Sequence, residues 1–179
     1  MRTIPDLHPD DTVARHALAE RLRVIRECRN ITQAEAAERY GCDKYAFSQL
    51  ERRRTWHVHT VQAMARIYGY RLTFDLGGLM VPDDGDPLAA LYDASQPTTE
   101  AAEDRLELLI VVNNLTRIRR AANLSLADAG LRMGCSESAV YRREADPGRL
   151  LVSTLQRHTR ALGGVLDLSV VPAYQGAAV

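Results

Sequence analysis

The chain alternates between stretches in which apolar residues recur at helical spacing and short breaks marked by glycine or capping residues. In the first stretch, Leu18, Leu22 and Ile25 form one apolar stripe, which predicts an amphipathic helix. Asp11 or Thr12 is the expected N-cap, because a short polar side chain can accept from the free N–H groups of the first turn.

Two short helices separated by a glycine follow this stretch. Thr32, with Glu35 three residues later, is typical of a capping box and predicts where the first of them begins. Gly41 is expected to end it, since glycine adopts the left-handed C-cap conformation at least cost. Asp43 then caps a helix over residues 44–52. Two helices joined through a glycine-centred turn are typical of a helix-turn-helix motif.

A fourth helix between Thr60 and Gly69 leads into a segment with a period of two. Leu72, Phe74 and Leu76 alternate with polar residues there, which predicts a short strand. A single strand leaves backbone hydrogen-bonding groups unpaired. We therefore expect it to pair with a second strand, either in this chain or in another one.

The same pattern is repeated in the second half of the chain. Its first helix is expected to begin near Thr98 or Thr99, and Leu166, Leu168 and Val170 predict a second closing strand. Residues of the two halves match at an offset of 93 in the first part of the pattern and of 94 in the second part. This difference of one residue is what a duplication followed by a loop insertion would leave. The matched residues are Ile25/Ile118, Arg26/Arg119, Thr32/Ser125, Gly41/Gly134, Cys42/Cys135 and Glu51/Glu144 at an offset of 93, and Thr60/Thr154, Gly69/Gly163 and Leu72/Leu166 at an offset of 94.

The distribution of charge divides the chain in the same way. Lys and Arg number 23 and so do Asp and Glu, and a net charge of zero by itself argues against a nucleic-acid-binding protein. However, residues 1–76 carry a net charge of +3, residues 77–104 carry −7 and residues 105–179 carry +4. We therefore predict a mainly α fold with two helix-turn-helix domains, over 1–76 and 105–179. Each would end in a short β-strand, and an acidic linker over 77–104 would join them and loop away from DNA.

Other classes of protein are not indicated. No apolar run approaches the roughly 18–20 residues of a membrane span, and the N-terminus lacks the apolar segment of a secretory signal. Three cysteines without metal-ligand spacing fit a reducing cytoplasm. His57 and His59 are not joined by a cysteine or carboxylate in a metal-binding pattern, and no nucleophile elbow or phosphate loop is present. We expect no enzymatic activity, no cofactor and no metal ion.

The first helix-turn-helix stretch resembles the Cro/C1-type (XRE) family of phage repressors. Residues 32–55, TQAEAAERYGCDKYAFSQLERRRT, match that family almost position by position, with Ala37 as the small residue between the helices and Phe47 seating the second helix. The stretch SLADAGLRMGCSESAVYRREA resembles it less closely, because Leu126 replaces a usual glutamine and Arg143 a usual apolar residue. The resemblance implies a lambda-repressor-like fold in both halves.

The resemblance also implies which side chains contact DNA. Residues on the exposed face of each second helix would read bases, since Gln can pair with adenine and Lys or Arg with guanine. Residues at the start of the motif and after the second helix would contact phosphates. The implied base-reading residues are Lys44, Tyr45, Ser48, Gln49, Glu137, Ser138, Tyr141 and Arg142, and the implied phosphate contacts are Gln33, Arg52, Arg53, Arg54, Trp56, Arg143 and Arg149.

Two pairs of charged residues match an ion pair that links the first and third helices of similar repressors. They are Arg26 with Glu51 and Arg119 with Glu144. We interpret both pairs as structural.

These features predict a sequence-specific transcriptional repressor of double-stranded DNA, similar to temperate-phage immunity repressors and acting in the bacterial cytoplasm. Because the two recognition faces differ, one chain would read two unlike half-sites. We therefore expect a monomer on an asymmetric operator, rather than a homodimer formed through the closing strands. Two alternatives stay open: an antitoxin of the HigA type whose second half or strands bind a toxin, and a second half that serves only for dimerisation.

Overall fold

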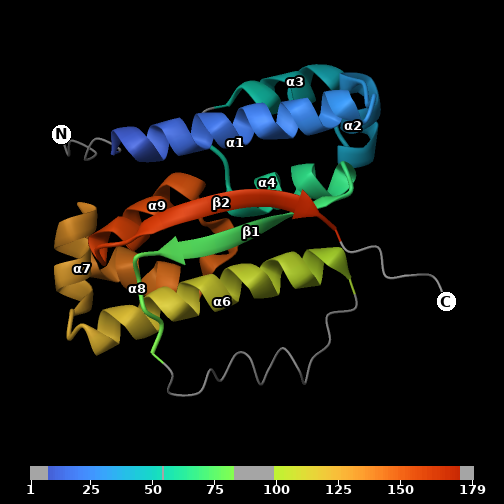
Figure 1. Cartoon of the computed structure of the whole chain (residues 1–179). Coiled ribbons are helices and arrows are strands. Elements are labelled where there is room, and N and C mark those ends of the chain that lie inside the picture. Colours follow the sequence, from blue (N-terminus) through green and yellow to red (C-terminus); the bar gives the residue numbers. More distant parts are fainter. Residues whose placement is uncertain (1–7, 54, 83–98, 174–179) are drawn as a thin grey trace.

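The computed structural model describes residues 8–53, 55–82 and 99–173, and within them the chain is mainly helical (Figure 1). None of these helices is long and apolar enough to cross a membrane. The first half contains α1 (Pro9–Cys28), α2 (Gln33–Tyr40), α3 (Lys44–Arg52), α4 (Val58–Ile67) and β1 (Tyr70–Gly77). The second half contains α6 (Glu100–Ala121), α7 (Leu126–Met133), α8 (Glu137–Ala145), the 3-10 turn η1 (Pro147–Arg149), α9 (Val152–Ala161) and β2 (Val165–Pro172).

Helix α1 begins earlier than the sequence predicted. Its N-cap is His8, and Pro9 occupies the first turn, where a missing N–H leaves no helical hydrogen bond unmade. Asp11, one of the two predicted caps, lies inside the first turn and is buried, with 3% of its surface exposed. Its carboxylate is therefore available for a contact with another part of the chain. Helix α6 begins directly after Thr99, one of its two predicted caps.

The turns between the paired short helices follow the sequence pattern closely. Thr32 and Ser125 each form a capping box with an acidic residue three positions later. Gly41 and Gly134 end α2 and α7 in the left-handed region, with φ of 83° and 64°. Gly130 lies where α7 meets the turn before α8: a Cβ there would approach a carbonyl oxygen of that turn to 2.8 Å, which only glycine avoids.

The two strands pair with each other, which confirms that alternative of the prediction. β1 and β2 are antiparallel, and their register runs from Tyr70 opposite Pro172 to Gly77 opposite Val165. Their apolar side chains, which include the buried Leu72, face the helices beneath them.

A second antiparallel contact joins the halves. His57 forms an isolated bridge with Leu151. The N–H groups of Val58 and Val152 donate to carbonyls of the opposite segment, both at 2.9 Å. These two donors are 94 residues apart, the same offset that relates the second part of the sequence repeat. A half-turn in the plane of Figure 1 accordingly exchanges α1 with α6 and β1 with β2.

The first helix of each half packs against the fourth helix of the other. In one of these contacts, Arg160 Nε of α9 donates to Asp11 Oδ1 of α1 at 2.8 Å. Gln156 Nε2 donates to the Asp11 carbonyl at 3.0 Å. Both bonds connect residues that lie more than one hundred positions apart in the chain.

The equivalent contact is present on the other side of the molecule. Arg66 Nη2 of α4 donates to Asp104 Oδ1 of α6 at 3.0 Å, and Gln62 Nε2 donates to the Asp104 carbonyl at 2.7 Å. The first helix of each half therefore contacts the fourth helix of the other half, and the two contacts are reciprocal.

The main apolar core is shared between the two halves. It contains Leu22, Phe47 and Met64 from the first half together with Leu115 and Leu155 from the second. A smaller cluster beneath α7 and α8 consists of Ala129, Met133, Val140 and Ala161. The division into separate domains at residues 76 and 105 stays a prediction.

Regular structure extends into the predicted acidic linker from both sides. β1 continues to Gly77, and α6 begins at Glu100. Asp104, which the charge pattern assigned to the linker, is buried in α6 because it binds Arg66. Residues 83–98 lie outside the described residues, and so does the prediction that this segment loops away from DNA.

Candidate nucleic-acid interface

The exposed side of α3 carries the first set of predicted base-reading residues. Lys44 and Gln49 are exposed, Tyr45 is 75% exposed, and Ser48 is half-buried. Phe47 points the other way and is fully buried, so it fixes which face of α3 reaches the surface.

Helix α8 presents the second set in the same manner. Glu137, Ser138 and Arg142 are exposed, and Tyr141 is 61% exposed. Val140 is fully buried and seats this helix. Arg142 Nε donates to the Ser138 carbonyl at 3.3 Å, which holds the guanidinium along the helix.

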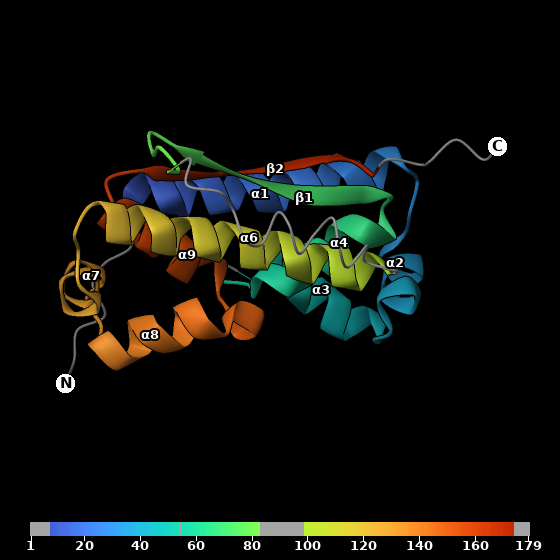
Figure 2. The same cartoon turned by 90° about the horizontal axis from the view of Figure 1, so that it is seen from below.

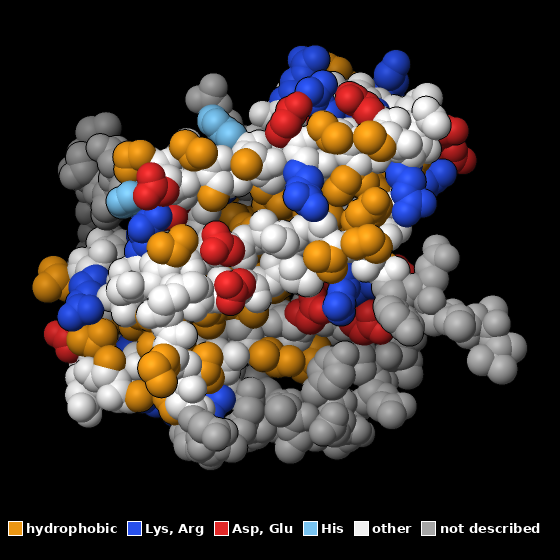
Figure 3. Space-filling model, viewed as in Figure 1, with side chains coloured by type: hydrophobic (Ala, Val, Ile, Leu, Met, Phe, Trp, Pro, Cys, Tyr) orange, Lys and Arg blue, Asp and Glu red, His pale blue; other side chains and the backbone are white. Residues whose placement is uncertain are grey.

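Both α3 and α8 lie on the side of the molecule away from the sheet (Figure 2). The sheet side is different in charge: Asp75 and Asp167 are exposed and directly opposite each other in the register. Figure 3, which views that side, shows acidic side chains near the middle of the face. Phosphates would be repelled there, which leaves the α3–α8 side as the candidate DNA-binding face.

Three of the predicted phosphate contacts are exposed on the surface. Arg52 and Arg53 lie at and just after the C-terminal end of α3, and Arg149 lies in η1 after α8. Arg54 lies outside the described residues.

The predicted phosphate contact by Trp56 is wrong. Its side chain is buried, with 3% exposed, and its indole Nε1 donates to the Leu50 carbonyl at 2.9 Å. The chain turns inward after α3 to make the bridge at His57, which carries the preceding indole into the core.

Two other predicted phosphate contacts are engaged within the protein. Gln33 Nε2 donates to Glu51 Oε2 at 2.6 Å. Arg143 Nη1 donates to Cys135 Sγ at 3.2 Å, and the side chain is half-buried. A phosphate contact by either side chain stays a prediction and would need it to leave its partner.

Glu51 is the centre of a buried hydrogen-bonded group that joins α1, α2 and α3. Arg26 Nε donates to Glu51 Oε1 at 2.7 Å, and Arg26 Nη1 donates to the Ile31 carbonyl at 3.0 Å. Burial, together with the nearby Glu51 carboxylate, raises the pKa of Tyr68, whose hydroxyl lies 3.5 Å from Glu51. The ion pair between Arg26 and Glu51, which is largely removed from water, thus holds α1 and α3 of the first motif together.

Glu144 has the same position in the second half. Arg119 Nε and Nη2 donate to its two carboxylate oxygens, both at 2.8 Å, in a bidentate arrangement. His158 Nε2 lies 3.6 Å from Glu144 Oε1 and has no hydrogen-bond partner among the described residues. Burial lowers the pKa of His158 to about 4, so the imidazole is neutral at pH 7.

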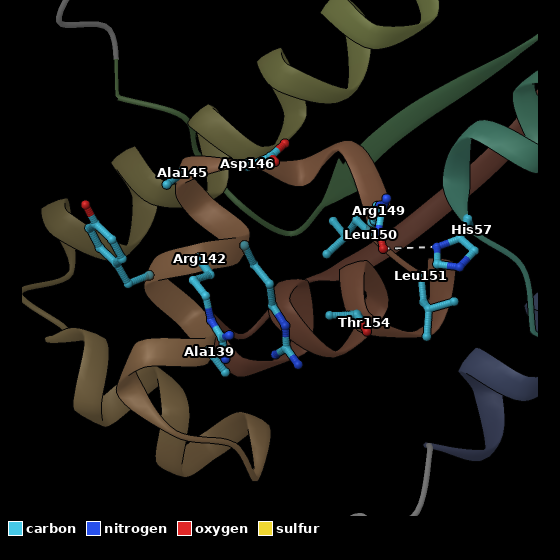
Figure 4. Close-up of a pocket in the computed structure, with 11 residues that line it drawn as sticks. His57, Ala139, Arg142, Ala145, Asp146, Arg149, Leu150, Leu151 and Thr154 are labelled. Atoms are coloured by element: carbon cyan, nitrogen blue, oxygen red, sulfur yellow. Dashed lines mark hydrogen bonds between the residues drawn. The ribbon is translucent and has the colours of Figure 1, made fainter.

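A cationic pocket lies between α8, η1 and the bridge at His57 (Figure 4). Its volume is about 620 Å³, and three arginines, Arg142, Arg143 and Arg149, line it together with one acid, Asp146. His57 faces α8 across the pocket, and its Nδ1 lies 3.0 Å from the Arg149 carbonyl. Because a carbonyl can only accept, Nδ1 carries the proton in this bond. The three guanidinium groups of the pocket are donors of the kind that bind phosphate.

Sequence reasoning missed the residues that join the halves. It treated Asp11 only as a possible N-cap and Asp104 only as part of the acidic linker, and it gave no role to Arg66 or Arg160. A signal was present, because Asp11 and Asp104 match at the offset of 93 and Arg66 and Arg160 match at the offset of 94. An acid and a base that are both repeated indicate an ion pair, although spacing alone does not say that it crosses from one half to the other.

One comparison with known proteins bears on the class of this chain. Residues 17–71 match the family described as helix-turn-helix domain, which supports a DNA-binding protein with a helix-turn-helix motif. A search of curated proteins found no match, and neither did a search of solved structures. The matched segment includes α2 through α4 and most of α1, so it contains the whole first motif.

Proposed function

We propose that this chain is a sequence-specific transcriptional repressor, similar to phage immunity repressors, that binds an asymmetric double-stranded operator as a monomer. In this proposal the chain is a tandem pair of helix-turn-helix units. Its recognition helices, α3 and α8, enter the major groove in two places.

The placement of α3 and α8 carries the proposal. When two copies are related by a two-fold rotation, a residue faces its own equivalent only on the rotation axis. Two pairs of equivalent residues, each 94 positions apart, face each other in this chain: Phe74 with Leu168, and His57 with Leu151. The line through them is an approximate two-fold axis with the recognition helices at one end (Figure 2). Helix-turn-helix dimers place their recognition helices on successive turns of DNA through such an axis. Here a single chain supplies both helices.

The chemistry of the two faces supports an asymmetric site. Gln49 suits adenine, and Lys44 suits guanine. At the equivalent positions, Arg142 suits guanine, and Glu137 suits the amino group of cytosine. The two halves of the operator are therefore expected to differ in sequence.

Selection of binding sites from random double-stranded DNA, with the full chain, tests the proposal. We expect two unlike motifs with centres about 10 base pairs apart or a multiple of that, and a complex that contains one chain per site. A perfectly palindromic site, or two chains per site, would refute the asymmetric reading. Failure to enrich any site would refute the proposal that the chain is a sequence-specific repressor. In a separate experiment, co-purification of a small ribonuclease-like partner would favour the alternative that the chain is an antitoxin.

A further inference from the structure

A second cavity, of about 540 Å³, lies between the halves on the side of α4 and the N-terminal part of α6. It is separate from the predicted base-reading residues, although it reaches η1. Its lining includes Gln62, Ala63, Asp104, Arg105, Leu108 and Arg149, together with His59 and Asp146.

Two acceptor oxygens of residues that line this cavity have no donor among the residues that the structure describes. Gln62 is 1% exposed, its Nε2 is bonded to the Asp104 carbonyl, and no described residue donates to its Oε1. Arg66 donates to Asp104 Oδ1 from both Nε and Nη2, and no described residue donates to Oδ2. Neither oxygen is wholly removed from solvent, so both can accept from a ligand that enters the cavity.

The equivalent place in the other half shows what such a donor looks like. Gln156 has the same role as Gln62, but its Oε1 accepts from Arg15 Nη1 at 2.7 Å. Arg15 is 3% exposed, so its guanidinium occupies the space beside that glutamine. The residue equivalent to Arg15 is Leu108, which is shorter and has no donor. The second site therefore lacks the guanidinium that the first site contains.

We propose that this cavity binds a small molecule whose guanidinium group donates to Gln62 Oε1 and Asp104 Oδ2. A guanidinium is a planar set of five donors, so one such group can donate to two acceptors. The exposed Arg105 and Arg149 also line the cavity and suit a carboxylate on the same molecule. An amino acid with a guanidinium side chain, such as free arginine, has both groups.

Occupancy of this cavity would also affect DNA binding, an extension that rests on the proposed function. Arg149 lies in η1, directly after α8, and is a predicted phosphate contact. A ligand carboxylate bound to Arg149 withdraws that guanidinium from DNA. The ligand therefore lowers operator affinity, and by linkage the operator lowers ligand affinity by the same factor.

Calorimetric titration of the full chain without DNA tests the site, with L-arginine as ligand and L-citrulline as the isosteric neutral control. We expect saturable binding of one arginine per chain. Citrulline, which replaces the charged group with a urea, should bind about tenfold more weakly. Absence of arginine binding at millimolar concentrations, or equal binding of citrulline, would overturn the proposal.

Two variants copy the other half into this site. Leu108→Arg introduces the guanidinium found at position 15, and Ala63→Arg introduces the arginine found at position 157. Each folded variant should lose arginine binding, whereas the exposed control Arg21→Ala on α1 should retain it. Arginine binding that persists in a folded Leu108→Arg or Ala63→Arg protein would contradict the site.

The effect on DNA is measured separately, as operator affinity with and without saturating arginine. A weaker operator complex supports the coupling, and an unchanged affinity overturns it. Because the titration contains no DNA, failure of the site and failure of the repressor proposal give different results.

Discussion

Asp11 of α1 and Arg160 of α9 form an ion pair between the two halves of the chain, with 2.8 Å between the carboxylate oxygen and Nε. Asp104 and Arg66 form its counterpart. Since each half contains both an acid and a base of this kind, the contact is self-complementary: two copies of one half could make it with each other.

The first prediction concerns a fragment of residues 1–79 expressed alone. It contains Asp11, Gln62 and Arg66, and its Phe74 lies at the centre of the strand register, where it would face its own copy. We expect a symmetric homodimer in sedimentation equilibrium. Arg66→Glu places two acids together, so this variant should dissociate or unfold the dimer. A wild-type fragment that is a folded monomer would contradict the prediction.

The second prediction concerns the ion pair beneath the first motif. Glu51→Ala leaves Arg26 buried without its carboxylate and removes the acceptor for Gln33. The free energy of unfolding should fall by roughly 3–5 kcal/mol, as measured by chemical denaturation. Glu38→Ala, at an exposed position of α2, is the control and should change it little. An unchanged denaturation midpoint for Glu51→Ala would show that the pair is not structural.

The third prediction separates the two halves of the operator. Gln49→Ala should cost about 1–3 kcal/mol of binding and relax specificity at bases in one half-site. Arg142→Ala should do the same in the other half-site. Arg53→Ala should instead weaken binding to all sequences and reduce its dependence on salt. These affinities are measured on operators altered in one half at a time.

A different result for Arg142→Ala would revise the role of α8. If that variant left both half-sites unaffected, α8 would not read bases, and the second half would serve for docking. If both variants affected the same half-site, the proposed arrangement of the recognition helices would be wrong.

The fourth prediction concerns acid stability. His158 has a pKa of about 4 when folded, against an ordinary value near 6.5, because its imidazole is buried. Below pH 6.5 the unfolded chain therefore takes up a proton that the folded chain does not. Stability should fall by up to about 3 kcal/mol between pH 6.5 and pH 4, and this contribution should level off below pH 4.

The variant His158→Met tests this assignment, because methionine is the residue at the equivalent position of the first half, Met64. The variant should show a flatter dependence of unfolding free energy on pH in that window. An unchanged pH profile would mean that another group is responsible for the loss of stability.

The fold was predictable from the sequence wherever local chemistry determines it. The capping box at Thr32, the left-handed glycines at Gly41 and Gly134, and the period of two around Phe74 each give a short-range signal, and each element is present. The first turn of α1 was missed because His8 is a less common cap than Asp11.

The packing of each first helix against the fourth helix of the other half was not predictable, because it depends on contacts between distant segments. A stripe of apolar residues shows that α1 packs on something, but not on which half. The same limit explains Trp56. An aromatic residue after a recognition helix fits either the surface or the core, and the choice depends on the bridge between His57 and Leu151.

Pairing of β1 with β2 inside one chain has a consequence for the response to protein concentration. A repressor assembled from two separate subunits loses binding on dilution twice, once at the operator and once at its own interface. Under the proposed function, in which the monomer binds DNA, no assembly step precedes binding and operator occupancy follows the first power of the protein concentration. Such a repressor binds its operator as soon as the first copies are synthesised. Its operator occupancy then rises gradually with protein concentration, without a threshold.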